Sequence, residues 1–184
     1  MRIVGGKFRG TALAALGKGD AGAHLRPTSD RVREALFNVL ASRGGFEGAR
    51  VLDLFAGTGA LGLEALSRGA AHVTAVDDGV KARALLRENV EKLRAMAEVK
   101  LYRRDATKLG EHQGLPFDLI FLDPPYGKGL GERALVGAMK GGWLAPGAMI
   151  VWEESAPMEP PQGFALLDRR SYGDTHITLM EAPA

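Results

Sequence analysis

The sequence predicts an α/β fold in which a doubly wound, mostly parallel β-sheet forms the centre of a single domain. Two observations support this prediction. Short apolar segments, typical of buried strands, alternate along the chain with longer segments whose apolar residues recur at helical spacing. A glycine-rich turn over residues 57–62 follows the first of the predicted strands, which is where sheets of this class bind nucleotides. We expect the domain to span residues 28–184 and to follow a basic N-terminal arm or hairpin over residues 1–27.

The elements of the domain are predicted in order along the chain. The first helix is expected from about Ser29, because Thr28 or Ser29 can cap it and Asp30 suits the positive end of its dipole. Gly44 and Gly45 end it. Right-handed crossovers should make the sheet mostly parallel, except for an antiparallel closing pair. The expected strands span residues 50–54, 72–76, 99–102, 118–122, 148–153, 165–169 and 176–180, and the later helices span residues 60–67, 80–96 and 132–140.

The composition excludes several classes of protein. With 46% hydrophobic and 25% charged residues, the chain is typical of a globular domain. It has no cysteine, which excludes a disulfide framework and suits the reducing cytoplasm, where we expect the protein. Its four histidines have no ligand spacing, so we expect no metal. The first residues lack the apolar core of a signal peptide, and no apolar run approaches the ~20 residues of a membrane helix, so we expect no membrane partner.

Basic residues gather at the start of the chain, although the net charge of the whole chain is only +2. A basic arm on a near-neutral body is what a polyanion partner requires. From charge alone, a solvated tail is an equally good interpretation. Up to residue 33 the charged residues are Arg2, Lys7, Arg9, Lys18, Arg26, Arg31 and Arg33 against Asp20 and Asp30.

The glycine-rich turn is the first candidate site. Its glycines allow a close approach to a ligand, and Asp77, at the end of the second strand, can accept hydrogen bonds from ribose hydroxyls. The pattern also fits a dinucleotide fingerprint, which keeps a nicotinamide-dependent dehydrogenase open as an alternative. Asp53 disfavours that alternative, because it would repel a pyrophosphate but not a cofactor with an amino acid tail and a sulfonium cation. Asp105, just past the third strand, could bind the amino group of an adenine. The candidate cofactor-binding residues are Asp53, Phe55, Ala56, Gly57, Thr58, Gly59, Asp77, Asp105 and Ala106.

The second candidate site directly follows the fourth strand and consists of Asp123, Pro124, Pro125 and Tyr126. Open α/β sheets bind ligands at this edge. The two prolines fix the backbone and remove two N–H donors. A carboxylate and a rigid carbonyl can then accept both hydrogens of an NH2 group, and Tyr126 offers a face on which a base can stack. Because an aromatic amine is a poor nucleophile, the pattern predicts a catalytic site that works by positioning this nitrogen for methyl transfer.

At these residues the sequence resembles the class I S-adenosylmethionine-dependent methyltransferases, whose amino-methylating branch carries an Asp/Asn-Pro-Pro-Tyr/Phe motif. It is most similar to the bacterial family that methylates guanine N2 in small-subunit (16S) ribosomal RNA. The similarity covers nearly the whole chain, and the Arg-Pro-Thr segment at residues 26–28 is its most specific part. The chain departs from the family in a longer, Gly-rich segment over residues 12–23 and in a Gly-rich loop after Tyr126. The matching segments are residues 2–10, 25–38, 53–68 and 123–126.

The resemblance implies a Rossmann-like, seven-stranded sheet whose last strand is antiparallel. It implies S-adenosyl-L-methionine as the cofactor, with Asp77 on its ribose and Asp105 near its adenine. Residues 123–126 would surround the target guanine. The partner would be ribosomal RNA within an assembled or partly assembled small subunit.

The basic residues would then face RNA phosphates. Arg26 precedes Pro27, which should hold it extended for a fixed contact, although a structural salt bridge is an alternative. Arg31 and Arg33 are two positions apart on a helix and cannot both face one phosphate track, so we expect at least one of them to be structural. The candidate RNA-binding residues are Lys7, Arg9, Arg26, Arg31 and Arg33.

Other functions remain open at this point. An amino-methyltransferase that acts on DNA adenine or cytosine would need a target-recognition region, for which 184 residues leave little room. One that acts on a protein glutamine would favour Asn at position 123. A dehydrogenase would leave residues 123–126 unexplained, and a non-catalytic RNA-binding module would leave the glycine-rich turn unused. Trp143 and Trp152 are expected to pack in the core rather than to stack on bases.

Overall fold

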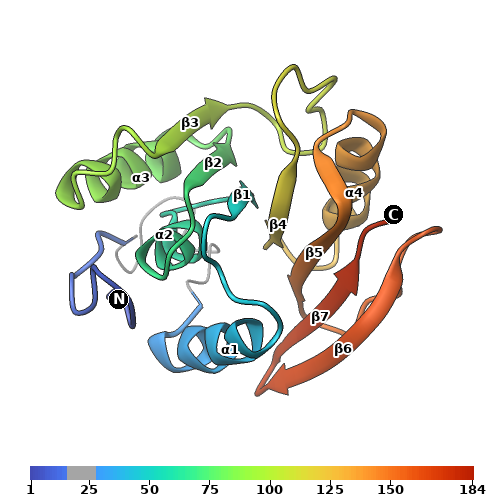
Figure 1. Cartoon of the computed structure of the whole chain (residues 1–184), viewed down its shortest axis with the longest axis horizontal. Coiled ribbons are helices and arrows are strands. Elements are labelled where there is room, and N and C mark those ends of the chain that lie inside the picture. The colour runs from blue at the N-terminus through green and yellow to red at the C-terminus, as the bar shows by residue number, and fades with distance from the viewer. Residues whose placement is uncertain (16–27) are drawn as a thin grey trace.

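The computed structural model describes residues 1–15 and 28–184 (Figure 1). Seven strands form one sheet in the order β3-β2-β1-β4-β5-β7-β6. Strands β1 to β5 run parallel, whereas β7 runs antiparallel to β5 and to β6. The predicted mostly parallel sheet and its antiparallel closing pair are therefore confirmed. The strands are β1 (Arg50–Leu54), β2 (His72–Asp77), β3 (Val99–Arg103), β4 (Phe117–Leu122), β5 (Leu144–Glu154), β6 (Ala165–Tyr172) and β7 (Thr175–Glu181).

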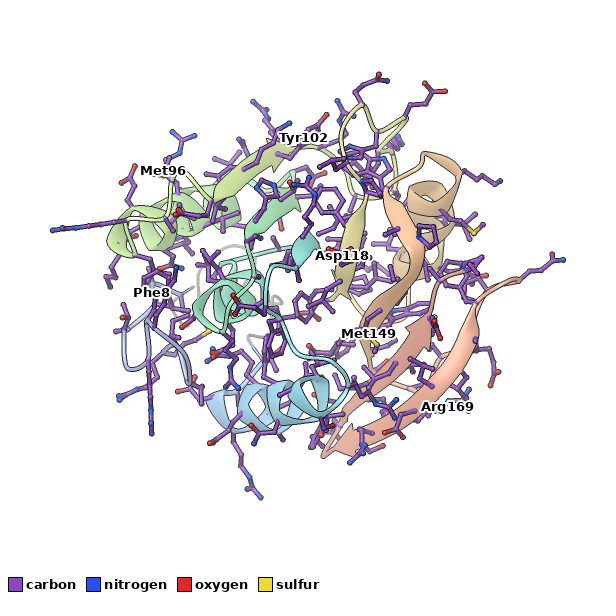
Figure 2. The ribbon with its side chains drawn as sticks, in the orientation of Figure 1. Phe8, Met96, Tyr102, Asp118, Met149 and Arg169 are labelled. Atoms are coloured by element: carbon purple, nitrogen blue, oxygen red, sulfur yellow. The ribbon has the colours of Figure 1, made fainter. Side chains whose placement is uncertain are left out.

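Helices cover both faces of the sheet. They are α1 (Asp30–Ser42), α2 (Ala60–Ser67), α3 (Val80–Lys92) and α4 (Leu130–Lys140). Successive strand residues point to opposite faces, so Val51 belongs to the apolar cluster of α1, α2 and α3, whereas Leu52 belongs to the cluster of α4. Figure 1 shows α4 beside β4 and β5, and Figure 2 shows side chains filling the spaces between the ribbons. Within the described ranges, no helix is long and apolar enough to span a membrane.

Helix α1 begins where its cap predicts, whereas α4 begins at Leu130, before the predicted residue 132, and α3 ends early. The hydroxyl of Ser29 accepts a hydrogen bond from the amide of Val32 at 3.2 Å, which caps α1. The helix expected over residues 80–96 ends at Lys92, because Arg94 adopts a left-handed φ of 54° and stops the helical ladder. Met96 therefore lies beyond α3, where its side chain is 52% exposed (Figure 2).

Strand β5 is longer than the expected strand over residues 148–153. It begins at Leu144, which pairs with Phe117 of β4, and the register then shifts so that Leu119 pairs with Met149. This irregularity accommodates Pro146, which has no N–H to donate inside a sheet. Pro146 and Gly147 interrupt the apolar run, so the sequence pattern did not predict this part of the strand.

Residues 1–15 form a short hairpin that lies on α2. Arg2 and Ala12 form an antiparallel bridge, and Ile3 is fully buried. At Gly6, with a φ of 80°, a Cβ atom would lie 1.9 Å from the carbonyl oxygen of Ser67, so the close contact with α2 requires glycine. The hairpin is thus a packed element. The division of the chain at residues 27 and 28 stays a prediction.

Candidate functional site

A cavity of about 610 Å3 opens at the carboxyl ends of β1 and β4. Asp53 and residues 55–58 line it from the β1 end, and residues 123–126 line it from the β4 end. The structure therefore brings together the two motifs that the sequence singles out, at the sheet edge where open α/β folds bind ligands. Four of the candidate cofactor-binding residues are not part of this lining: Gly59, Asp77, Asp105 and Ala106.

The loop after β1 has the conformation that its glycines require. Gly57 and Gly59 have φ angles of 58° and 84°, and a Cβ atom on Gly59 would lie 2.3 Å from the side chain of Leu86 on α3. The Cβ position of Gly57 faces open space, which leaves its backbone accessible to a ligand. Phe55 also has a positive φ, 59°, and such conformations in large residues cluster at functional sites.

Asn89 joins this loop to the N-terminal hairpin. Its side chain is fully buried and donates to the carbonyl oxygens of Thr58, at 2.9 Å, and Ala14, at 3.1 Å. It also accepts from the amide of Ala14 at 2.7 Å. One amide group on α3 therefore fixes both the end of the hairpin and the cavity loop.

The acids at the ends of β2 and β3 lie beside the loop and are held in place. The carboxylate of Asp77 accepts from the amides of Gly57 at 2.9 Å and Gly79 at 2.8 Å. Asp105 accepts two hydrogen bonds from Thr107, and these bonds hold its pKa below the usual value. Both bonds use Oδ1 of Asp105, so Oδ2 retains its capacity to accept from a ligand amino group.

Acidic groups dominate the electrostatics of the cavity. Burial raises the pKa of Asp53 to about 8, opposed by a hydrogen bond from the amide of Gly62 and assisted by the charge of Asp77. The pKa of Asp123 is also raised, first by loss of hydration and then by the carboxylates of Glu153 and Asp53. Such a cavity favours a cationic ligand and disfavours a pyrophosphate.

Comparison with known proteins identifies the family. A family model described as "Conserved hypothetical protein 95" matches residues 1–181. The chain belongs to this family. It is 40% identical to Ribosomal RNA small subunit methyltransferase D of Escherichia coli K12 over 153 residues, which are 83% of this chain and 74% of that protein. It is 35% identical to the Haemophilus influenzae protein of the same name, over 94% of this chain and 89% of that one.

Solved structures of other proteins share the fold. An Escherichia coli protein, yhhF, described as a candidate methyltransferase, superposes with a TM-score of 0.85 at 34% identity, covering 100% of this chain and 98% of that one. TrmN of Thermus thermophilus has a TM-score of 0.67 at 28% identity, covering 82% of this chain and 48% of that one. The predicted class is confirmed: the protein is a class I S-adenosylmethionine-dependent methyltransferase with a seven-stranded sheet.

The structure separates the basic residues expected to bind RNA. The side chains of Lys7, Arg9 and Arg31 are exposed and available to a phosphate backbone. The assignment of Arg33 is wrong, because its side chain is fully buried and its guanidinium bonds Glu64 at 3.1 Å. Arg33 also pairs with Asp30. Arg26 lies outside the described residues.

Glu64 explains why this family member buries Arg33. Its carboxylate is fully buried and accepts from the amides of Val4 and Gly5, each at 2.9 Å, as well as from Arg33 and from Arg68 at 2.9 Å. One carboxylate thus ties the N-terminal hairpin, α1 and α2 together. One feature of the sequence indicated this buried role. Arg31 and Arg33 are two positions apart on a helix, so at least one of them was expected to be structural.

Several functional candidates were not found from the sequence. The cavity is also lined by Thr28, which belongs to the Arg-Pro-Thr segment, and by Lys128, Ser155, Asp174 and His176, which no motif marked. Asp174 lies in the turn between β6 and β7 and His176 lies at the start of β7, and only folding places them beside the loop after β4. The two tryptophans are buried as expected. No cluster of His, Asp or Glu within the described ranges could hold a metal ion.

Proposed function

We propose that this protein transfers a methyl group from S-adenosylmethionine to the exocyclic N2 amine of a guanine in small-subunit ribosomal RNA. The observation that carries the proposal is the single cavity that joins the glycine loop after β1 to residues 123–126 after β4. The names of two relatives, each called Ribosomal RNA small subunit methyltransferase D, support the ribosomal substrate. We further propose that the protein acts in the cytoplasm, where small subunits are assembled.

The residues around the cavity fit the cofactor. A volume of about 610 Å3 suits a ligand of its size. The open backbone at Gly57 allows close approach, Asp77 can accept from the ribose hydroxyls, and the free oxygen of Asp105 can accept from the adenine amine. Asp53, buried and acidic, complements a cationic amino acid tail. When bound, the cofactor supplies a methyl group on a sulfonium, which is a good leaving group.

The loop after β4 would hold the nucleophile. Asp123 and the carbonyl of Pro124 accept the two hydrogens of the guanine amine, which orients its nitrogen toward the methyl group. Because its pKa is raised, the ionised carboxylate of Asp123 is suited to accept the proton that the nitrogen releases after transfer. The ring of Tyr126 stacks on the base, which is worth about 1–3 kcal/mol.

The base must reach this cavity from a folded RNA. Extruding it costs a few kcal/mol, and phosphate contacts by Lys7, Arg9 and Arg31 offset part of that cost. The exposed N-terminal hairpin is the surface on which we propose that the RNA backbone lies. Its role is to deliver the nucleotide, while residues 123–126 select its amino group.

The proposal is tested by labelled methyl transfer to small subunits purified from cells that lack this methylation. Naked ribosomal RNA, DNA and protein extract are assayed in parallel, and nucleoside mass spectrometry identifies the product. N2-methylguanosine from the ribosomal substrates alone is expected. Label in DNA or protein would overturn the substrate assignment, and an Asp123→Ala variant as active as wild type would overturn the assignment of the site.

A further inference from the structure

A hydrogen-bonded chain behind the cavity joins three segments that are far apart in the sequence. Glu153, near the end of β5, is only 4% exposed. Its Oε2 accepts from the hydroxyl of Thr28 at 2.7 Å, and its Oε1 accepts from the hydroxyl of Tyr126 at 3.1 Å. Each carboxylate oxygen therefore has one donor, one from the residue before the α1 cap and one from the loop after β4.

Contacts with the end of β5 hold the loop after β4. Gly127 and Gly129 both have positive φ angles, 73° and 68°, and flank an exposed lysine. The amide of Gly127 donates to Glu154 at 3.1 Å. Two consecutive carboxylates of β5 therefore hold this loop, Glu154 by the backbone after Tyr126 and Glu153 by the hydroxyl of Tyr126 itself.

The bond between Tyr126 and Glu153 is suited to fix the ring. Burial and the neighbouring carboxylates of Glu153 and Asp123 raise the pKa of Tyr126, so its hydroxyl stays protonated and can donate. A buried carboxylate needs its lone pairs satisfied, and the short bond from Thr28 leaves the other oxygen of Glu153 directed at Tyr126. Thr28 and Tyr126 both line the cavity, so these hydrogen bonds organise the site and not the apolar core.

We propose that Glu153 is a positioning residue that fixes the ring of Tyr126 through its hydroxyl, and that Thr28 holds Glu153 in the required orientation. The inference rests on the proposed function, in which the ring of Tyr126 stacks on the target base. A ring that is fixed before the base arrives loses less conformational entropy on binding, so stacking and alignment of the amine improve together. The start of α1, which carries no catalytic group, thereby takes part in aligning the substrate.

Four substitutions separate positioning from general stability. Tyr126→Phe removes only the hydroxyl, and Thr28→Val removes only the donor to Glu153. Glu153→Leu removes both bonds, whereas Glu153→Gln keeps an acceptor for Tyr126 and a polar contact for Thr28. Thr74→Val is the matched control, because Thr74 is also buried but lies on β2 and bonds the ring of His72.

Single-turnover methyl transfer and cofactor affinity are measured for each variant. Loss of a hydrogen bond to a charged group should slow transfer by about tenfold or more in Tyr126→Phe and Glu153→Leu, with the cofactor Kd changed less than about twofold. Glu153→Gln should restore most of the rate, and Thr28→Val should be slower than the Thr74→Val control. Thr28→Val combined with Tyr126→Phe should be no slower than Tyr126→Phe alone, because Thr28 acts through Glu153 on the hydroxyl.

A second measurement does not depend on the substrate. With 3-fluorotyrosine in place of tyrosine, the resonance of Tyr126 can be assigned by Tyr126→Phe among the three tyrosines. It should shift in Thr28→Val and Glu153→Leu but not in Thr74→Val. An unshifted resonance in Thr28→Val, or rate losses that multiply in the double variant, would overturn the inference. If the resonance shifts as expected in the variants but the wild-type protein methylates no guanine, the positioning role of Glu153 is supported and only the proposed function is rejected.

Discussion

The ionisation of Asp53 should make cofactor affinity depend on pH. Burial raises the pKa of Asp53 to about 8, so in the free protein near neutral pH its carboxyl group is mostly protonated. A ligand that carries a cationic amino group and a sulfonium favours the ionised carboxylate. Binding below about pH 8 therefore requires Asp53 to release a proton, and affinity should increase as the pH rises.

The size of the effect follows from this titration. With a pKa of about 8, Asp53 is about 1% ionised near pH 6 and about 90% ionised near pH 9. If only the ionised form binds, the apparent Kd should fall about tenfold between pH 6 and pH 7, where an α-amino group with a pKa of about 7.8 is still mostly cationic. The effect on the free protein has the opposite sign. Because the folded-state pKa exceeds the usual value, the contribution of Asp53 to stability is present at low pH and is lost as the pH rises through about 8.

Isothermal titration calorimetry in pairs of buffers with different ionisation enthalpies measures both the Kd and the protons released. Wild type should release about one proton on binding near pH 6 and near pH 7, where Asp53 is mostly protonated and the amino group of the cofactor is mostly cationic. Asp53→Asn is the control, because it keeps an acceptor for the Gly62 amide, 3.0 Å away, but cannot titrate. The reasoning is refuted if the wild-type Kd is constant with pH or if the Asn variant shows the same slope.

Three further outcomes are expected. Arg33→Met and Glu64→Leu should each lower the free energy of unfolding by up to about 3–5 kcal/mol in urea denaturation, because each leaves a buried charge with only its less buried partner, Arg68 or Asp30. Losses that add fully in the double variant would contradict the pairing. Arg31→Ala should keep wild-type stability but weaken RNA binding and reduce the salt slope by about one, and an unchanged slope would argue against a phosphate contact. Gly59→Ala should destabilise the protein more than Gly57→Ala in thermal melts, because only at Gly59 would the new Cβ meet a side chain, at 2.3 Å, and equal melting temperatures would contradict this difference.

The parts of the fold that the sequence predicted are those with a local signal. The strand at Arg50–Leu54 and the helix at Ala60–Ser67 were predicted with their observed bounds, because an apolar run and a glycine turn mark each boundary. The end of α3 was not, because a left-handed Arg94 has no compositional signature. The first part of β5 was missed for a related reason, since Pro146 normally argues against a central strand and only the register shift opposite β4 admits it.

The candidate site shows the same division. Residues 53–59 and 123–126 could be found because each motif is contiguous and its chemistry is visible in its residue types. Glu153 could not, because a glutamate after an apolar run is an ordinary surface residue until the fold buries it beside Thr28. The prediction that Arg33 contacts phosphate was wrong because its buried partner, Glu64, lies on another helix and is distant in the sequence.

The charge of the cavity distinguishes S-adenosylmethionine from a dinucleotide, although the fold could bind either. A glycine turn followed by an acid at the end of β2 suits a dinucleotide as well as S-adenosylmethionine. Burial, and after it the neighbouring carboxylates, raise the pKa of both Asp53 and Asp123, so a cation in the cavity would favour their ionised forms. A pyrophosphate would add negative charge there, whereas a sulfonium and an amino tail would lower both pKa values and let both carboxylates ionise. Cofactor binding would then also prepare Asp123 as an acceptor for the guanine amine, so the same electrostatics that select the cofactor would activate the site for the nucleotide.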